Sequence, residues 1–366
     1  MSVIMLNVNP NRPDLSKIRL AAKAIKSGKL VVFPTETVYG IGANALDGKA
    51  CMKIFRVKGR PQDNPLIVHV SSMEMAERIA EIPPKYRKQI MALWPGPLTL
   101  ILKAKAGIPK EVTAGLPTVA VRFPSNLVAL ALIKAAGVPI AAPSANVSKR
   151  PSATEASHAA SYFRKGVAYI IDSGISSFGI ESTILDLSGF RILRPGAMTV
   201  EQISSAFMKR PILSPAATAK GVKGKPISPG MKYLHYSPEK PLLLFTGNRA
   251  ELAKIFKRHG NDAAFIGSEE SCMALGDLVK NKLVLGRRND QRMVARNLFR
   301  YLIKLDSLDV NFGIAEAVPE NGLGTAVMNR LRKASGNREC ASAYEAERFI
   351  QKIKAPKMRH KAKSSH

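Results

Sequence analysis

Short apolar segments alternate with helical segments along the first two hundred residues, and this alternation restricts the fold more than any other feature. Apolar periodicity predicts helices at residues 16–27 and 49–57, and a further helix that begins after Asn126. Strands are predicted at residues 30–33, 65–70, 98–103, 119–123, 138–143 and 168–172. Strands and helices joined by short links indicate an α/β domain, a mixed sheet flanked by helices with functional loops at the strand ends.

A change in composition separates this domain from a second one. The stretch "LSPAATAKGVKGKPISPGMKYLHYSPEK" is rich in Pro, Gly, Ser, Ala and Lys, which is typical of an extended linker, although "GMKYLHY" suggests that part of it docks. Beyond it, "PLLLF", "AAFIG" and "KLVLG" predict short buried strands, and residues 289–305 predict a long helix. We therefore expect a domain at 1–213, a linker at 214–240, a smaller α/β domain at 241–352 and a disordered basic tail at 353–366.

Cysteine spacing and hydropathy exclude several classes of protein. Cys51, Cys272 and Cys340 lie far apart, in neither a zinc spacing nor a disulfide framework, so we predict a reducing, cytoplasmic setting without metal-binding side chains. The N-terminus has no signal-peptide pattern. The most apolar run, residues 127–145, is interrupted by a lysine, a glycine and two prolines, so no membrane segment is predicted.

The charge is strongly basic and evenly distributed. The chain has 56 basic and 27 acidic residues, a net charge of +29, of which residues 1–213 carry 28 minus 13, or +15. Such an excess favours polyanionic partners such as nucleotides or RNA. The even distribution argues against a dedicated nucleic-acid module, so a solvated basic surface is the preferred interpretation and contact with RNA the alternative.

Two polar motifs at predicted strand ends suit a phosphate site, although the common glycine-rich nucleotide loops are absent. In "KGRPQDNPL" the prolines predict a non-helical loop in which Lys58 and Arg60, two residues apart, face the same way. In "APSAN", Ser144 and Asn146 follow a strand and offer a hydroxyl and an amide. Taken alone, the second motif would be interpreted as a capped turn.

Charged residues in apolar surroundings supply further candidates. Arg122 in "VAVRF" requires an anionic or carbonyl partner, because burying a guanidinium without one is costly. His69 ends an apolar strand and, by itself, is interpreted as a core residue. "GIESTI", with Glu181 and Ser182, and "RILRPG", with Arg194, are each compatible with ordinary turns.

In combination these motifs carry a resemblance. "PTETVYG", "KGRPQDNPL", "WPGPLT", "VAVRFP", "APSAN", "GIESTI" and "RPG", in this order, resemble the threonylcarbamoyl-AMP synthase family, and "GMKYLHYSP" and "GLGTAVMNRLRKAS" resemble its long form. The fold so implied is an N-terminal YrdC-type domain with a mixed twisted sheet flanked by helices, and a smaller C-terminal Rossmann-like α/β domain. The basic tail is not part of this pattern.

The resemblance implies a nucleotidyltransferase that converts ATP, L-threonine and bicarbonate into L-threonylcarbamoyl-AMP and pyrophosphate. Mg²⁺ is expected to enter with ATP, and no nucleophilic side chain is required, because a carbamate of threonine attacks the α-phosphorus. This reaction is the first step toward N6-threonylcarbamoyladenosine in tRNA, so the tRNA threonylcarbamoyl transferase machinery is the expected functional partner. Weak binding of tRNA or double-stranded RNA is a further expectation.

Residue roles follow from the same resemblance. Lys58 and Arg60 are the expected catalytic cations. The expected ATP side comprises Lys58, Arg60, Asn64, Thr118, Ser144, Asn146, Ser152, Arg194, His235 and Tyr236. The expected threonine side comprises Thr37, His69, Arg122, Ala142 (through its backbone) and Ser182. His235 and Tyr236 are predicted to fold over the nucleotide and keep water from the product.

Two alternatives remain open at this stage. Hydrogenase-maturation carbamoyltransferases also make a carbamoyl adenylate with a YrdC-type domain, but they carry zinc-type cysteine pairs that this chain lacks. A double-stranded RNA or tRNA-binding protein is the alternative from a different class, suggested by the net charge.

Overall fold

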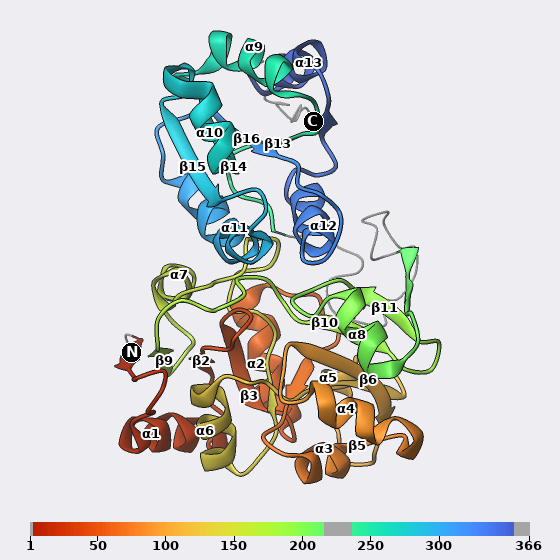
Figure 1. Ribbon diagram of the computed structural model, residues 1–366. Helices are drawn as coiled ribbons and strands as arrows, with labels where there is room; N and C mark the ends of the chain where they lie inside the picture. Colours follow the sequence, from red (N-terminus) through yellow and green to blue (C-terminus); the bar gives the residue numbers. More distant parts are fainter. Residues whose placement is uncertain (1–2, 216–235, 355–366) are drawn as a thin grey trace, which may run out of the picture.

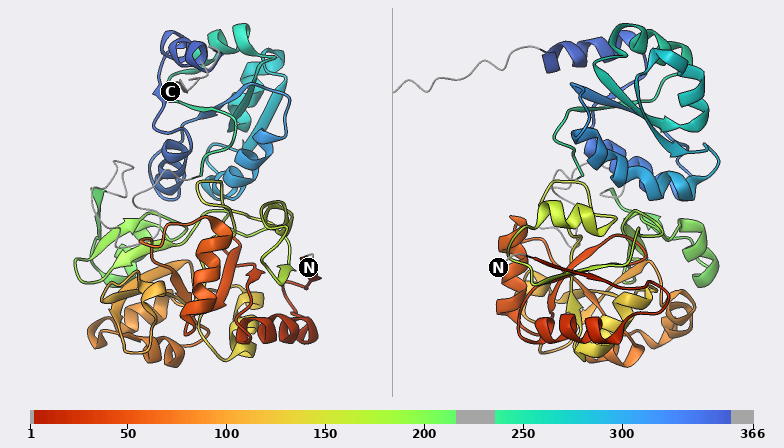
Figure 2. Two further views of the ribbon diagram at one scale, coloured as in Figure 1. Left: turned by 180° about the vertical axis from the view of Figure 1, so that it is seen from behind. Right: turned by 90° about the vertical axis from the view of Figure 1, so that its left-hand side faces the viewer.

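The protein forms two α/β units, one stacked on the other (Figure 1). The computed structural model describes residues 3–215 and 236–354. Most of the expected linker and basic tail, together with His235, therefore lies outside the described residues. Figure 2 shows from two further sides that the second unit rests on one end of the first. The prediction of two α/β units, the first with a mixed sheet, is confirmed.

The first unit is built on a twelve-stranded mixed sheet. Its strand order is β1-β9-β2-β3-β8-β4-β7-β6-β10-β11-β12, with β5 paired to β6, and parallel and antiparallel neighbours both occur. The strands are β1 (Ile4–Asn7), β2 (Val31–Phe33), β3 (Gly40–Asn44), β4 (Ile67–His69), β5 (Ala80–Glu81), β6 (Leu98–Ala104), β7 (Thr118–Arg122), β8 (Ile140–Ala141), β9 (Tyr169–Asp172), β10 (Thr183–Asp186), β11 (Arg191–Arg194) and β12 (Ile212–Leu213).

Helices cover this sheet because its strands are apolar on both faces. Val31 and Phe33 pack in one buried cluster and Val32 in another, as the alternation of side chains along a strand requires. The helices are α1 (Leu15–Lys26), α2 (Gly48–Lys58), α3 (Met73–Ile79), α4 (Arg87–Leu93), α5 (Lys110–Thr113), α6 (Leu127–Ala136), α7 (Ala156–Tyr162) and α8 (Val200–Phe207), with a 3₁₀ turn at Pro84–Tyr86.

Local sequence signals determine where the helices next to the functional loops begin and end. Asp47 accepts a hydrogen bond from the backbone N–H of Ala50 and so caps the start of α2. Gly59 ends α2 in the left-handed conformation, with φ of 59°. The same device recurs in α6, which starts at the cap Asn126 and ends at Gly137. The predicted non-helical loop at Lys58 is therefore wrong by one residue: Lys58 is the last residue of a helix that Gly59, ahead of Pro61, terminates.

The second unit is a five-stranded parallel sheet with helices on both faces. Its strand order is β15-β14-β16-β13-β17, which agrees with the Rossmann-like expectation. The strands are β13 (Leu242–Phe245), β14 (Ala263–Ser268), β15 (Asn281–Gly286), β16 (Phe312–Glu316) and β17 (Glu339–Cys340). The helices are α9 (Arg249–His259), α10 (Glu269–Leu275), α11 (Gln291–Asp306), α12 (Gly324–Ala334) and α13 (Ala343–Lys354), with a 3₁₀ turn at Gly276–Leu278.

The two faces of the second sheet have different neighbours. Leu243 and Phe245 pack with α9, α10 and α13, whereas Leu242 and Leu244 pack with α11 and α12. Figure 1 shows α11 and α12 at the end of this unit that faces the first unit. The second cluster also includes Val38 of the first unit, so part of the core is shared between the two units.

Candidate active site

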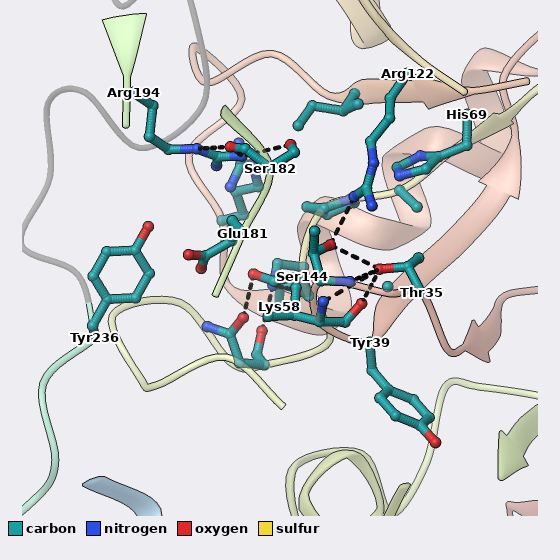
Figure 3. A pocket seen from close by; sticks show the side chains of 18 of the residues that line it. Thr35, Tyr39, Lys58, His69, Arg122, Ser144, Glu181, Ser182, Arg194 and Tyr236 are labelled. Atoms are coloured by element: carbon teal, nitrogen blue, oxygen red, sulfur yellow. Dashed lines mark hydrogen bonds between the residues drawn. The ribbon is translucent and has the colours of Figure 1, made fainter. Parts of the chain in front are cut away.

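A polar cavity lies among the loops that follow the strands of the first unit. It has a volume of about 700 Å³, counting the space open to solvent. The predicted site residues that line it are Thr37, Lys58, Arg60, His69, Arg122, Ala142, Ser144, Asn146, Ser182, Arg194 and Tyr236. Figure 3 shows Arg122 and His69 on one side and Glu181, Arg194 and Tyr236 on the other. Two separate sets of predicted residues thus meet in one cavity.

Lys58 is a buried cation that joins two loops of the cavity. It is only 2% exposed, and its Nζ donates hydrogen bonds to the backbone oxygens of Ser144, at 2.6 Å, and Asn146. Burial lowers the pKa of Lys58 well below its ordinary value, Arg60 lowers it further, and Glu181 opposes this shift. An anion entering the cavity would favour the charged form of this amine.

The loop after β8 presents the hydroxyl and amide expected from "APSAN". Ser144 Oγ donates to Asn146 Oδ1 at 2.5 Å. Asn146 Nδ2 donates to the backbone oxygens of Val147, at 2.8 Å, and Arg150, at 2.9 Å. Because Lys58 binds the backbone of the same loop, the cation and these polar groups hold one another in place.

Arg122 lies on the opposite side of the cavity (Figure 3). It is 4% exposed, and its Nη2 lies 2.7 Å from Glu36 Oε1 in an ion pair. Its Nη1 donates to Thr37 Oγ1 at 2.8 Å. His69 lies beside Arg122 because β4 and β7 pair in parallel register. Burial, with the charge of Arg122 adding to it, lowers the pKa of His69 to about 3, so the imidazole is neutral near pH 7.

Glu181, Ser182 and Arg194 complete the cavity. Arg194 Nε and Nη2 donate to the backbone oxygen of Ser182 at 3.1 and 2.9 Å. Glu181 Oε1 accepts a hydrogen bond from Ser152 Oγ at 2.6 Å. Burial opposes ionisation of Glu181, but the charges of Arg330 and Arg194 outweigh it and hold its pKa below the ordinary value. Glu181 thus remains a carboxylate that is neutralised within the protein.

Tyr236 belongs to the predicted linker and is the first described residue after position 235, and it lines the cavity from the side of the second unit. It is 5% exposed and has a φ of 68°, which is uncommon for a residue with a side chain. Its ring packs 5.1 Å from the ring of Phe299. Burial raises its pKa to about 12. Tyr236 is therefore a neutral phenol that closes one end of the cavity.

Three expected ATP-side residues are described but do not line the cavity. Ser152 is buried and donates a hydrogen bond to Glu181, which does line the cavity. Asn64 is buried beside the cavity, where its backbone oxygen accepts a hydrogen bond from Arg60 Nε at 3.3 Å. Thr118 begins β7, about 13 Å along that strand from Arg122. The roles of these residues stay predictions.

Besides Lys149, which lines the cavity, three acidic or basic residues at or beside it were missed as site residues. They are Glu36, Glu181 and Arg330, which pair with or surround predicted residues. Glu36 and Glu181 lie within the motifs "PTETVYG" and "GIESTI", so an acidic residue in each motif was the available signal. Arg330 comes from the second unit, and its place within the motif "GLGTAVMNRLRKAS" was the available signal.

Metal-binding clusters and membrane-spanning helices are both absent from residues 3–215 and 236–354. No group of three or more His, Cys, Asp or Glu side chains in this part of the chain could hold a metal ion. The three cysteines are free thiols and are buried. No helix in the same residues is long and apolar enough to cross a membrane.

Fold and cavity together define a class of protein. It is a two-domain α/β protein whose cation-lined cavity suits two ligands, a polyanion and a smaller molecule with a carboxylate. Comparison with known proteins is more specific. Residues 23–196 match the Sua5/YciO/YrdC family model, described as telomere recombination. Residues 198–336 match the model described as threonylcarbamoyl-AMP synthase, C-terminal domain.

Whole-length relatives agree with these matches. The chain is 45% identical to a threonylcarbamoyl-AMP synthase of Pyrococcus abyssi, covering 92% of this chain and 98% of that protein. It is 41% identical to the Bacillus subtilis protein of the same name, covering 90% and 95%. The crystal structure of P. abyssi Sua5 complexed with L-threonine superposes with a TM-score of 0.85 at 44% identity, covering 93% and 99%. The chain belongs to the threonylcarbamoyl-AMP synthase family.

Proposed function

We propose that this chain forms L-threonylcarbamoyl-AMP and pyrophosphate from ATP, L-threonine and bicarbonate. The observation that carries the proposal is that one cavity is lined by Arg122, which suits a carboxylate, and by a separate group of cations that suits phosphates, Lys58, Arg60 and Arg194. Membership of the synthase family supports it. The complex of the P. abyssi relative with L-threonine supports the amino-acid half of the cavity.

The threonine side is proposed to bind the amino acid through its carboxylate. Arg122 would pair with that carboxylate, and Thr37, which Arg122 already contacts, would accept or donate one further hydrogen bond. His69 would remain neutral, so it would not draw the carboxylate away from Arg122. The amine of threonine is then free to point toward the nucleotide and to take up bicarbonate as a carbamate, with loss of water.

The phosphate side is proposed to align the triphosphate for attack by this carbamate. An oxygen of the carbamate attacks the α-phosphorus, the bond to the β-phosphate oxygen breaks, and pyrophosphate leaves. Lys58, Arg60 and Arg194 would neutralise the charge that develops on the leaving group, so catalysis is mainly positioning and electrostatics. ATP enters as its Mg²⁺ complex. Glu181 is paired with Arg330, so we assign the metal to the phosphate oxygens and not to a protein carboxylate.

Tyr236 is proposed to shield the product. An acyl phosphate anhydride is labile to water, and the phenol lines the cavity on the side of the second unit.

The proposed consumer of the product is the enzyme machinery that transfers the threonylcarbamoyl group to adenosine in tRNA.

Pyrophosphate release tests the proposal. Release is measured with ATP and Mg²⁺ while L-threonine, bicarbonate or Mg²⁺ is omitted in turn, with Lys58→Ala/Arg60→Ala as the blank. Lys53→Ala, on the exposed side of α2, is the matched control. We expect release only with all components, abolished in the double variant and unchanged in the control. Release without threonine would indicate another carbamoyl adenylate, and no release with salt-sensitive RNA binding would favour an RNA-binding protein.

A further inference from the structure

The second unit contacts the first at loops that also form the cavity. Ile180 and Ala197 of the first unit pack in the same cluster as α11 and α12. At Gly179 (φ 69°) the backbones approach so closely that an added Cβ would lie 2.4 Å from the backbone oxygen of Arg296. Arg150, in the loop after Asn146, pairs with Asp306 at 2.5 Å. The position of the second unit is therefore coupled to loops of the cavity.

Arg330 is a charged residue that is fully buried at this contact. It lies on α12 and is 0% exposed. Its Nε and Nη2 donate to Glu181 Oε2 at 3.1 and 3.0 Å. Its Nη1 donates to the backbone oxygen of Pro195 and, at 3.3 Å, to that of Ala326 in its own helix. One rigid guanidinium thus joins α12 to two separate loops of the first unit.

Expected nucleotide-side residues lie one contact away from Arg330. Glu181 accepts on its other oxygen from Ser152. Pro195 directly follows Arg194 in the chain. The guanidinium carbon of Arg330 lies 5.7 Å from the ring centre of Tyr236, in a cation–π arrangement. On the threonine side, Ser182 directly follows Glu181 in the chain, whereas Arg122 is held by Glu36 and Thr37 of the first unit.

A buried charge is an expensive way to hold two domains together. Removing a guanidinium from water costs several kcal/mol, and an apolar residue of similar volume often stabilises an interface as well or better. What a guanidinium adds is fixed direction, because its planar donors constrain the partners in angle as well as distance. Since Glu181 neutralises it, Arg330 is not available as a phosphate ligand itself.

We propose that Arg330 is a positioning residue supplied by the C-terminal domain for the nucleotide side of the cavity. By holding Glu181 and Pro195 it sets the positions of Ser152, Arg194 and Tyr236. This inference rests on the proposed function, because it assigns a nucleotide to that side. It gives the second domain a defined task, to hold the phosphate-binding loops in the geometry that the reaction requires.

Ligand affinities measured on the full-length chain test the inference. Calorimetry gives the dissociation constants of a non-hydrolysable ATP analogue, with L-threonine saturating, and of L-threonine alone. For Arg330→Gln we expect analogue affinity to fall on the order of tenfold, with threonine affinity changed less than about twofold. Arg330→Lys, which keeps the charge, should recover part of the loss. Arg332→Gln is the matched control, since this arginine of the same helix pairs with Glu320 and Glu339 inside the second domain.

A double variant that removes both charges of the Glu181–Arg330 pair is a second test in case Arg330→Gln alone does not fold. Glu181→Gln/Arg330→Gln leaves neither half of this ion pair as an unpaired charge, and we expect the same selective loss of analogue affinity from it. Equal losses for both ligands, or no loss for either, would overturn the inference while leaving the proposed function intact. A wild-type chain that binds neither ligand would overturn both, so the two failures are distinguishable.

Discussion

The buried ion pair between Glu36 and Arg122 supports a quantitative prediction for Glu36→Gln. The side chains are 7% and 4% exposed, and the pairing atoms lie 2.7 Å apart. Removing one partner of such a pair typically costs about 3–5 kcal/mol, because the remaining charge stays buried. Glutamine keeps the volume of the side chain and a polar oxygen facing Arg122, so we expect a loss at the lower end of this range, about 3 kcal/mol in the free energy of unfolding.

The same substitution should strengthen threonine binding. In the wild-type chain the substrate carboxylate must share Arg122 with Glu36, and like charges a few ångströms apart repel by up to about 4 kcal/mol at an effective dielectric of 20. Part of this is lost to relaxation, so we expect the dissociation constant of L-threonine to fall about tenfold, or ~1.4 kcal/mol. The variant should therefore be the less stable protein and the tighter binder.

Denaturant unfolding with and without L-threonine, together with calorimetry, measures both effects. Glu81→Gln is the control: its pair with Lys103 is exposed, and breaking it should cost at most about 1 kcal/mol. Unchanged stability in Glu36→Gln would show that the pair is not buried as described. Weaker threonine binding would show that Glu36 orients Arg122 for the substrate and does not compete with it, and would refute the reasoning.

Three further predictions concern single residues. His69 has a pKa lowered to about 3, against an ordinary 6.5, so between these values the unfolded chain binds a proton that the folded chain does not. The free energy of unfolding should therefore fall as the pH drops through this window, by up to about 1.4 kcal/mol per pH unit. Urea unfolding at pH 7 and 5 should show a smaller fall for His69→Gln than for the wild-type chain. An equal fall in both would contradict a lowered pKa of His69. Lys58 has a lowered pKa, so binding of an ATP analogue should take up a proton, seen as a calorimetric heat that varies with buffer ionisation enthalpy and is absent in Lys58→Arg. The prediction fails if wild-type heats do not depend on the buffer. Tyr236→Ala should accelerate loss or hydrolysis of the product, and an unchanged product lifetime would remove its shielding role.

Much of the fold was predictable because its signals are local. Apolar runs bounded by Gly, Pro and capping residues place β6 almost to the residue and α6 at its start after Asn126. The polar motifs at strand ends are also local signals and were predictable for the same reason. Parallel neighbours in a sheet then bring such strand ends together at one edge. Lys58 shows the limit of such signals: the prolines indicate where a helix cannot continue, but Gly59 determines where α2 ends.

Pairings between distant residues were not predictable in the same way. Glu181 and Arg330 are 149 positions apart and meet only because α12 docks against the loops of the first unit. Glu36 lies in the loop after β2 and Arg122 is the last residue of β7, and the two meet only in the folded sheet. No local pattern records such a docking, so the cations and hydroxyls of the cavity were predicted and two of the carboxylates that neutralise its arginines were not.

Mass spectrometry of the nucleotide product tests the central claim most directly. The chain is incubated with ATP, Mg²⁺, L-threonine and ¹³C-labelled bicarbonate, and the products are separated at once to limit hydrolysis. The account predicts an adenylate that contains one intact threonine and one ¹³C atom, formed together with pyrophosphate. AMP or ADP alone, or an adenylate of threonine without the labelled carbon, would contradict it.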